Sequence, residues 1–260
     1  MKKELLNLKI LLLSLVAAGI FFSGALFAQK TNGGNNGKIS LGLEITPQFT
    51  KISNTNYVDC SSKVRPYTGI FILYDVNQVL KFKTGLFFDM RSYGIYLKTS
   101  GLKLSDSTGY TGYNSYLEFD FTNTVNYITV PVDFFYQKGD GKLKVFVEGG
   151  LYFSLTINNN SKGDGDMYIH PDDLDGFNDS TLTAGHHYKH FDSSNDNFFN
   201  TYDLGVNLGM GISYYFKPEL ALQFSPGFSY GLTNVFEDPE TSSKWSNIFK
   251  LHLAMVYKLK

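Results

Sequence analysis

Charged side chains recur at every second position along several stretches of the chain, and they are the first candidates for chemistry. Because successive side chains of a β-strand point to opposite faces, charges spaced by two residues share one face. On the inner wall of a narrow barrel, they would form either a network of salt bridges or an ion path. Both signs are interleaved, which favours the salt-bridged interior and predicts no strong ion selectivity. The candidates are Glu44, Lys81, Lys83, Asp89, Arg91, Asp133, Lys144, Glu148, Asp203, Lys250 and His252.

A second group of candidates lies in residues 158–200, which we expect to form one long, acidic loop. Carboxylate oxygens suit Ca²⁺, and grouped imidazoles suit Zn²⁺ or Cu²⁺. The weak metal candidates are Asp164, Asp166, Asp172, Asp173 and Asp175, and four of the five histidines, His170, His186, His187 and His190, share the stretch. The aspartate spacing does not match an EF-hand loop. We therefore favour a solvated surface loop with no metal or cofactor, and calcium binding is the alternative.

Nothing in the sequence assembles a catalytic site. Ser225, Asp203 and His252 could be drawn as a nucleophile–base–acid set, but they lie on different predicted strands and no spacing fixes their distances. Glycine-rich phosphate-binding motifs and a metalloprotease helix motif are absent from the sequence. Cys60 is the single cysteine, so the chain forms no internal disulfide, and a net charge of −1 gives no sign of a nucleic-acid partner. We predict that the protein is not an enzyme, and no small-molecule substrate is evident.

The elements that must position these side chains alternate with a period of two. In residues 204–216 the even positions carry Leu, Val, Met, Ile, Tyr and Phe, whereas the odd positions from 203 to 213 are small or polar. A turn at residues 217–219 follows, and the alternation resumes over residues 220–232. One face is apolar and aromatic, and the other is narrow and polar. This pattern is typical of strands that meet lipid on one side and line a small barrel on the other.

The same alternation predicts eight strands, at residues 38–52, 66–76, 79–97, 116–137, 142–157, 203–216, 220–232 and 246–260. Short connections near 75–78, 137–142 and 217–219 alternate with long ones near 53–65, which holds Cys60, and near 98–115, 158–200 and 235–245. This arrangement predicts an all-β fold: an eight-stranded antiparallel up-and-down transmembrane β-barrel. A soluble lipocalin-like barrel is the alternative, but it would place the apolar faces inside and leave the charged faces unexplained.

The predicted strand at residues 116–137 contains two irregularities. Its apolar residues upstream of Asn126 occupy the opposite parity to those downstream. Either a bulge near Asn126 switches the phase, or the upstream part stands above the membrane. Pro131 removes one donor from the hydrogen-bond ladder, which a bulge or kink would relieve.

Residues 1–28 have the features of a secretory signal peptide. Lys2 and Lys3 supply a positive start, residues 10–27 are mostly apolar, and cleavage is expected after Ala28. An anchoring helix is the alternative, because about 18 apolar residues approach the roughly 20 that span a bilayer. Residues 29–37 are then a flexible leader and residues 38–260 the barrel domain. We expect it in outer-membrane lipid, with both termini periplasmic and the long loops extracellular.

Short motifs spread along the chain carry a family resemblance. They are residues 127–132 (YITVPV), 147–153 (VEGGLYF), 208–215 (LGMGISYY), 228–234 (FSYGLTN) and 256–258 (VYK). In sequence, order and spacing, residues 38–260 resemble the PorT-like outer-membrane β-barrel domain family. Thr129 departs from the acidic or polar residue usual at its position in that family. The resemblance implies a small outer-membrane barrel, tied in some members to protein secretion, and it transfers no functional residue.

Three functions are left open by these observations. The first is a structural or accessory barrel of the cell envelope, whose partners would be proteins of a secretion or envelope-assembly complex. The second is a small passive channel. The third is a surface binding or adhesion module that uses the loop at residues 158–200.

Overall fold

The computed structural model describes residues 39–53, 59–100, 116–169, 185–193, 199–236 and 243–259. The predicted signal peptide and leader, residues 1–37, lie outside the described residues. Nine strands are present there: β1 Ile39–Ser53, β2 Asp59–Asp75, β3 Leu80–Ser100, β4 Tyr116–Lys138, β5 Leu143–Ile169, β6 Gly185–Ser193, β7 Tyr202–Lys217, β8 Leu220–Gly231 and β9 Lys244–Lys258. Among these residues, no helix has the length and apolar character needed to cross a bilayer.

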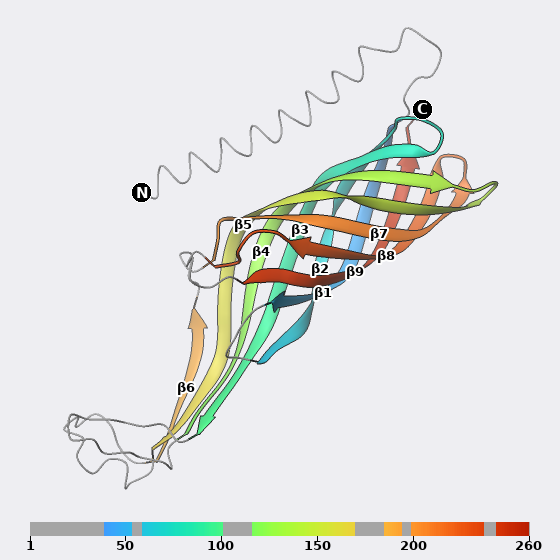
Figure 1. Cartoon of the computed structure of the whole chain (residues 1–260). Helices are drawn as coiled ribbons and strands as arrows, with labels where there is room; N and C mark the ends of the chain where they lie inside the picture. Colours follow the sequence, from blue (N-terminus) through green and yellow to red (C-terminus); the bar gives the residue numbers. More distant parts are fainter. Residues whose placement is uncertain are drawn as a thin grey trace.

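All strands except β6 form a closed antiparallel ring (Figure 1). Each ring strand pairs with the next one along the chain, β5 pairs with β7, and β9 returns to pair with β1. Eight strands therefore close into an up-and-down barrel, as the alternating sequence predicts. The predicted fold class is confirmed.

The two faces of the ring have opposite polarity. On β1, Leu43 and Ile45 are 56% and 67% exposed, whereas Glu44 between them is 1% exposed. Every ring strand contributes exposed apolar residues to the outer face, among them Leu43, Ile70, Leu86, Phe134, Val145, Leu208, Phe228 and Met255. Soluble proteins rarely expose a continuous apolar surface of this kind. The soluble-barrel alternative is therefore excluded, because its apolar face would point inward.

Several strands are longer than the alternation predicts. β2 begins at Asp59 instead of residue 66, which places Cys60 on a strand, and β5 continues to Ile169. Residues 158–169 and 185–193, predicted within one loop, are strand segments, and residues 161–169 pair with residues 185–193. Aromatic contacts explain this extension, since Phe191 of β6 packs against Phe121 of β4 with ring centroids 5.3 Å apart. Gly163 and Gly165 of β5 lie beneath these rings and leave room for them.

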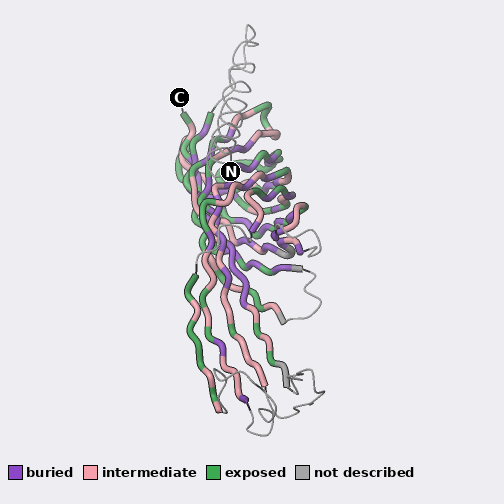
Figure 2. The backbone as a smooth tube through the Cα atoms, turned by 90° about the vertical axis from the view of Figure 1, so that its left-hand side faces the viewer, coloured by how far each residue is buried: buried purple, intermediate pink, exposed green. Residues whose placement is uncertain are grey.

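The long strands continue past the ring as a separate sheet, which we call the projecting sheet. It consists of residues 95–100 of β3, 116–125 of β4, 158–169 of β5, and β6. Figure 1 shows it at the lower left, and Figure 2 shows that most of its residues are exposed or of intermediate burial. In the strand order, β6 is the edge strand.

The phase change predicted near Asn126 has a clear structural explanation. β4 keeps one register against β3 from the Thr84–Val132 pair to the Ser100–Tyr116 pair, so β4 does not switch faces. The bulge lies in β5, where the pairing with β4 skips Ile157. The structure therefore favours the second alternative, since the upstream part of the strand continues beyond the apolar outer belt. The reversal of polarity marks the end of the apolar outer belt.

Pro131 is accommodated without a bulge in its own strand. The β3–β4 pairing lapses opposite Pro131, at Gly85 and Leu86, and resumes in the same register. On its other side, Pro131 keeps its pairing position opposite Tyr152. The lack of an N–H group at Pro131 therefore interrupts only the β3–β4 hydrogen-bond ladder, and only locally.

Candidate functional site: the packed lumen

The lumen is filled by side chains from all eight ring strands. The predicted lumen residues Glu44, Lys83, Asp89, Arg91, Asp133, Glu148, Asp203 and Lys250 are at most 7% exposed. Lys81, Lys144 and His252 are of intermediate burial. Because charged side chains in a water-filled pore would be solvent-accessible, this degree of burial indicates a packed interior. The ionic groups inside it form two clusters.

The first cluster is centred on Lys83 of β3. Its ammonium lies 3.2 Å from Glu44 of β1 and 3.1 Å from Glu148 of β5, and so joins three walls of the ring. His252 of β9 places Nδ1 2.5 Å from the second carboxylate oxygen of Glu44. A buried charge is tolerated when partners of this kind surround it. Each of the two carboxylate oxygens of Glu44 therefore has a polar partner.

The second cluster is centred on Arg91 of β3. Its Nε and Nη2 donate to Asp89 Oδ2 at 2.9 and 2.7 Å, and Nη1 donates to Asp203 of β7 at 2.5 Å. The remaining Nη2 proton faces Ser154 Oγ at 3.1 Å. The guanidinium also stacks over the ring of Tyr127 at 4.7 Å. Arg91 therefore uses the planar, multi-donor geometry that distinguishes arginine from lysine.

Two further lumen charges have weaker polar contacts. Asp133 accepts a hydrogen bond from Asn207 Nδ2 at 3.4 Å. The Lys250 ammonium lies 4.0 Å from the ring centroid of Tyr67. The cavity between these groups measures about 20 Å³, which is room for about one water molecule. The ionic clusters are therefore close-packed.

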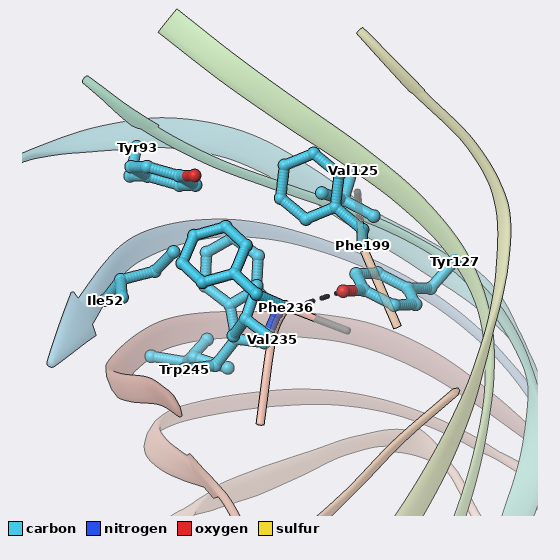
Figure 3. Packing of buried hydrophobic residues seen from close by; sticks show 9 residues of the cluster. Ile52, Tyr93, Val125, Tyr127, Phe199, Val235, Phe236 and Trp245 are labelled. Carbon is cyan, nitrogen blue, oxygen red and sulfur yellow. Dashed lines mark hydrogen bonds between the residues drawn. The ribbon is translucent and has the colours of Figure 1, made fainter. Parts of the chain in front are cut away.

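An apolar cluster, which we call the lid, closes the lumen at the end from which the projecting sheet extends. Figure 3 shows how the side chains of this cluster pack together. Its members are buried, and they are Ile52, Tyr93, Val125, Tyr127, Phe199, Val235, Phe236, Trp245 and Ile248. Trp245 Nε1 donates to the Tyr127 hydroxyl at 3.0 Å. Phe199 and Phe236 form an isolated bridge between the segments before β7 and after β8. Cys60 packs against this lid.

The lid was not anticipated from the sequence, although two signals point to it. Phe199 and Phe236 are large aromatic residues in connections that are mostly polar. Trp245, the only tryptophan, also lies in a predicted loop. In the structure it is 0% exposed, because β9 begins at Lys244 and carries its side chain into the lumen.

The candidate triad is not assembled. Ser225 lies opposite His252 in the β8–β9 register, but Asp203 is bound to Arg91 and to the hydroxyl of Tyr152, at 2.8 Å. Ser225 is 2% exposed, so a substrate would have no access to its hydroxyl.

The weak metal candidates within the described residues are paired with histidines of β6. Asp164 Oδ1 lies 2.7 Å from His190 Nδ1, and Asp166 Oδ2 lies 3.3 Å from His186 Nδ1. Asp172, Asp173 and Asp175 lie outside the described residues. Among the residues that are described, no three His, Cys, Asp or Glu side chains are grouped so as to hold a metal ion.

The projecting sheet has one polar and one apolar face. On the polar face, Glu118 accepts hydrogen bonds from Lys98 at 3.0 Å and from Tyr96 at 2.9 Å. These bonds, first the one from Lys98, hold the pKa of the Glu118 carboxyl below its usual value. The opposite face, continuous with the lumen wall, carries Phe119, Phe121 and Phe191. The sheet therefore presents ion pairs among tyrosine rings on one side and phenylalanine rings on the other.

Comparisons with known proteins agree with this architecture. The family model of the outer membrane protein β-barrel domain matches residues 27–237. No curated protein matches the chain.

Solved structures similar to the chain include Neisserial surface protein A, at 13% identity and a TM-score of 0.42, over 85% of this chain and 97% of that one. The N-terminal β-barrel domain of Pseudomonas aeruginosa OprF is 13% identical, with a TM-score of 0.39, over 86% of this chain and 100% of that one. Ail, the attachment invasion locus protein of Yersinia pestis, is 10% identical, with a TM-score of 0.37, over 86% and 100%. These structural similarities are distant, and the assignment of the chain to outer-membrane β-barrel proteins rests on the family match.

Proposed function

The chain belongs to the outer membrane protein β-barrel domain family, and from this premise we propose that it is a non-conducting, non-enzymatic barrel with a structural or accessory role. Membership of the family indicates location in the outer membrane. The proposed orientation places the short turns in the periplasm and the projecting sheet outside the cell. We include in this proposal a role in protein secretion or envelope assembly, which the narrower resemblance to the PorT-like family implies.

The observation that carries the proposal is the packed lumen. Asp89, Arg91 and Ser154 are at most 1% exposed in the middle of the ring. The buried lid covers the end from which the projecting sheet extends. An ion crossing the ring would have to break the Arg91–Asp203 pair and displace Trp245. The channel hypothesis is therefore the weaker one.

Conductance measurements on the folded full-length protein in planar bilayers test this proposal. We expect no channel events from the wild-type chain. A variant that loses both the second ionic cluster and the lid, Arg91→Ser with Trp245→Ala, is the comparison, and we expect events only from this variant. Reproducible, voltage-independent events from the wild-type chain would overturn the non-conducting assignment.

The projecting sheet favours a binding role at the cell surface as the second candidate. It presents an amphipathic surface beyond the lipid-facing belt, and β6 offers a strand edge for pairing with another chain. Replacing residues 160–192 by a short turn would remove β6 and the outer part of β5 while leaving the ring. Crosslinking in intact outer membranes should then lose the protein partners captured by the wild type. Retention of every partner would exclude the projecting sheet as the contact surface.

A further inference from the structure

A large cavity opens at the end of the ring opposite the lid, and we call it the vestibule. Its volume is about 1080 Å³, and the three short turns at residues 76–79, 139–142 and 218–219 contribute to its lining. Its inner part is lined by Gln137, Gln223 and Tyr215. These three are already bonded to one another or to Ser213, with Tyr215 donating to Gln137 at 3.1 Å. The inner end is therefore neutral.

The lining of the vestibule carries an excess of positive charge. Six lysines line it, namely Lys81, Lys138, Lys142, Lys144, Lys217 and Lys258, together with the three acids Asp75, Asp140 and Glu219. The formal charge of the lining is thus +3, although the whole chain is at −1. A concave wall with one sign of charge concentrates ligands of the opposite sign.

The ion pairs within the vestibule leave this excess in place. Lys81 and Lys258 share one carboxylate, that of Asp75, at 3.0 and 3.1 Å. Lys144 lies 5.1 Å from the ring centroid of Tyr215. Within the described residues, no carboxylate lies at salt-bridge distance from Lys144 or Lys142. These ammonium groups are available to an anionic ligand.

We propose that the vestibule binds an acidic segment of a partner polypeptide that enters from the short-turn end. Its volume is at or above the roughly 300–1,000 Å³ of small-molecule pockets. The lysines are spread from the turns at the rim, Lys142 and Lys217, to Lys144 and Lys81 further in, which suits a chain with several carboxylates better than a single anion. Residues 29–38, which precede the barrel, do not have the charge of such a ligand, because they contain Lys30 and Lys38 and no acidic residue.

Fluorescence anisotropy with the refolded full-length protein in a non-ionic detergent tests this proposal. The probe is fluorescein-labelled octaglutamate, and the comparison probe is a glycine–serine peptide of equal length. We expect saturable binding of octaglutamate only, weakened about tenfold or more when the salt rises from about 0.01 M to about 0.15 M, because salt screens these charges. Absence of saturable octaglutamate binding at low salt would overturn the proposal.

Charge reversals locate the binding site. Lys144→Glu and, separately, Lys142→Glu at the rim should each weaken octaglutamate binding about tenfold, which corresponds to about 1.4 kcal/mol. Lys98→Glu on the projecting sheet makes the same change of charge and should leave binding unchanged. A heat-dependent shift in gel mobility verifies that each variant has folded. Equal weakening by all three variants would show a general charge effect and overturn the assignment, as would displacement of the probe by millimolar inorganic phosphate, which would indicate a small-anion site.

Discussion

Arg91 of β3 and Asp203 of β7 form an ion pair across the lumen, with 2.5 Å between Nη1 and Oδ2, although their strands are not neighbours in the ring. Both side chains are at most 3% exposed. The pair therefore connects two walls of the barrel that share no backbone hydrogen bonds. Because Arg91 also binds Asp89 on its own strand, one guanidinium is the shared ion-pair partner of two buried carboxylates.

Arg91→Met is expected to destabilise the barrel by about 3–5 kcal/mol, because it leaves buried carboxylates without their counter-ion. The measurement is the free energy of unfolding by urea in lipid vesicles. Lys98→Met provides the matched control, since its partner Glu118 lies on the exposed face of the projecting sheet and the loss should leave the midpoint unchanged. A wild-type midpoint for Arg91→Met would contradict the structural role of the pair.

Gly205→Ala is expected to destabilise the barrel by about 1–3 kcal/mol through overpacking. A Cβ atom at this position would lie 2.3 Å from the carbonyl oxygen of Tyr230 and equally close to the ring of Tyr152, and the backbone atom cannot move aside. Gly149→Ala is the control, because there the nearest atoms would be 3.5 Å away. Urea unfolding and the folded fraction on unheated gels measure both. Equal free energies of unfolding for Gly205→Ala and Gly149→Ala would show that the lumen has room for the added methyl group, and would contradict the prediction.

The faces of the ring could be predicted from sequence, but the contacts across its lumen could not. Lipid outside and a packed polar interior impose opposite polarity on successive residues, so Leu43 and Glu44 are assigned correctly by alternation alone. Which inward residue meets which across the lumen depends on the stagger of the closed sheet. The sequence contains no direct signal of that stagger. The pairing of Arg91 with Asp203, and not with another acid, therefore required the structure.

β6 escaped prediction for a different reason. Its residues are mostly polar, and Phe191 is its only large aliphatic or aromatic residue on the apolar face. Besides its pairing with β5, it is held by contacts of Phe191 with Phe119 and Phe121, which lie two strands away on β4 and are reached over the glycines of β5. A period-two analysis considers one segment at a time, so it cannot detect contacts between residues of different strands. The same holds for Trp245, whose burial depends on where β9 begins.

Tyr127→Phe is expected to destabilise the protein by about 1–3 kcal/mol, because it leaves the buried Nε1–H of Trp245 without its acceptor. The intrinsic fluorescence of the single tryptophan reports the unfolding of the lid directly. Tyr257→Phe removes a hydroxyl from a residue that is 50% exposed on the outer face, and it should have no effect. Identical unfolding curves for the two variants would contradict the hydrogen bond in the lid.

The attachment of β6 is expected to depend on pH, because two of the aspartates that pair β5 with β6, Asp164 and Asp192, have lowered pKa values. Hydrogen bonds, first from His190 and then from Tyr188, lower the pKa of the Asp164 carboxyl. The bond from Lys162 likewise lowers the pKa of the Asp192 carboxyl. A carboxyl with a lowered pKa stabilises the folded state above its unfolded pKa, near 3.9, and this contribution is lost as the pH falls through the folded value. β6 should therefore loosen below about pH 4.

Amide hydrogen exchange between about pH 6 and pH 3, corrected for intrinsic rates, measures this loosening. Protection in residues 185–193 should fall with pH, whereas protection in residues 143–157 of the ring should persist. Asp164→Asn should weaken the dependence, since the amide keeps the shape of the side chain and carries no titratable proton in this range. If protection in both segments declined together, the transition would belong to the barrel as a whole, and the ion pairs of β6 would not be its cause.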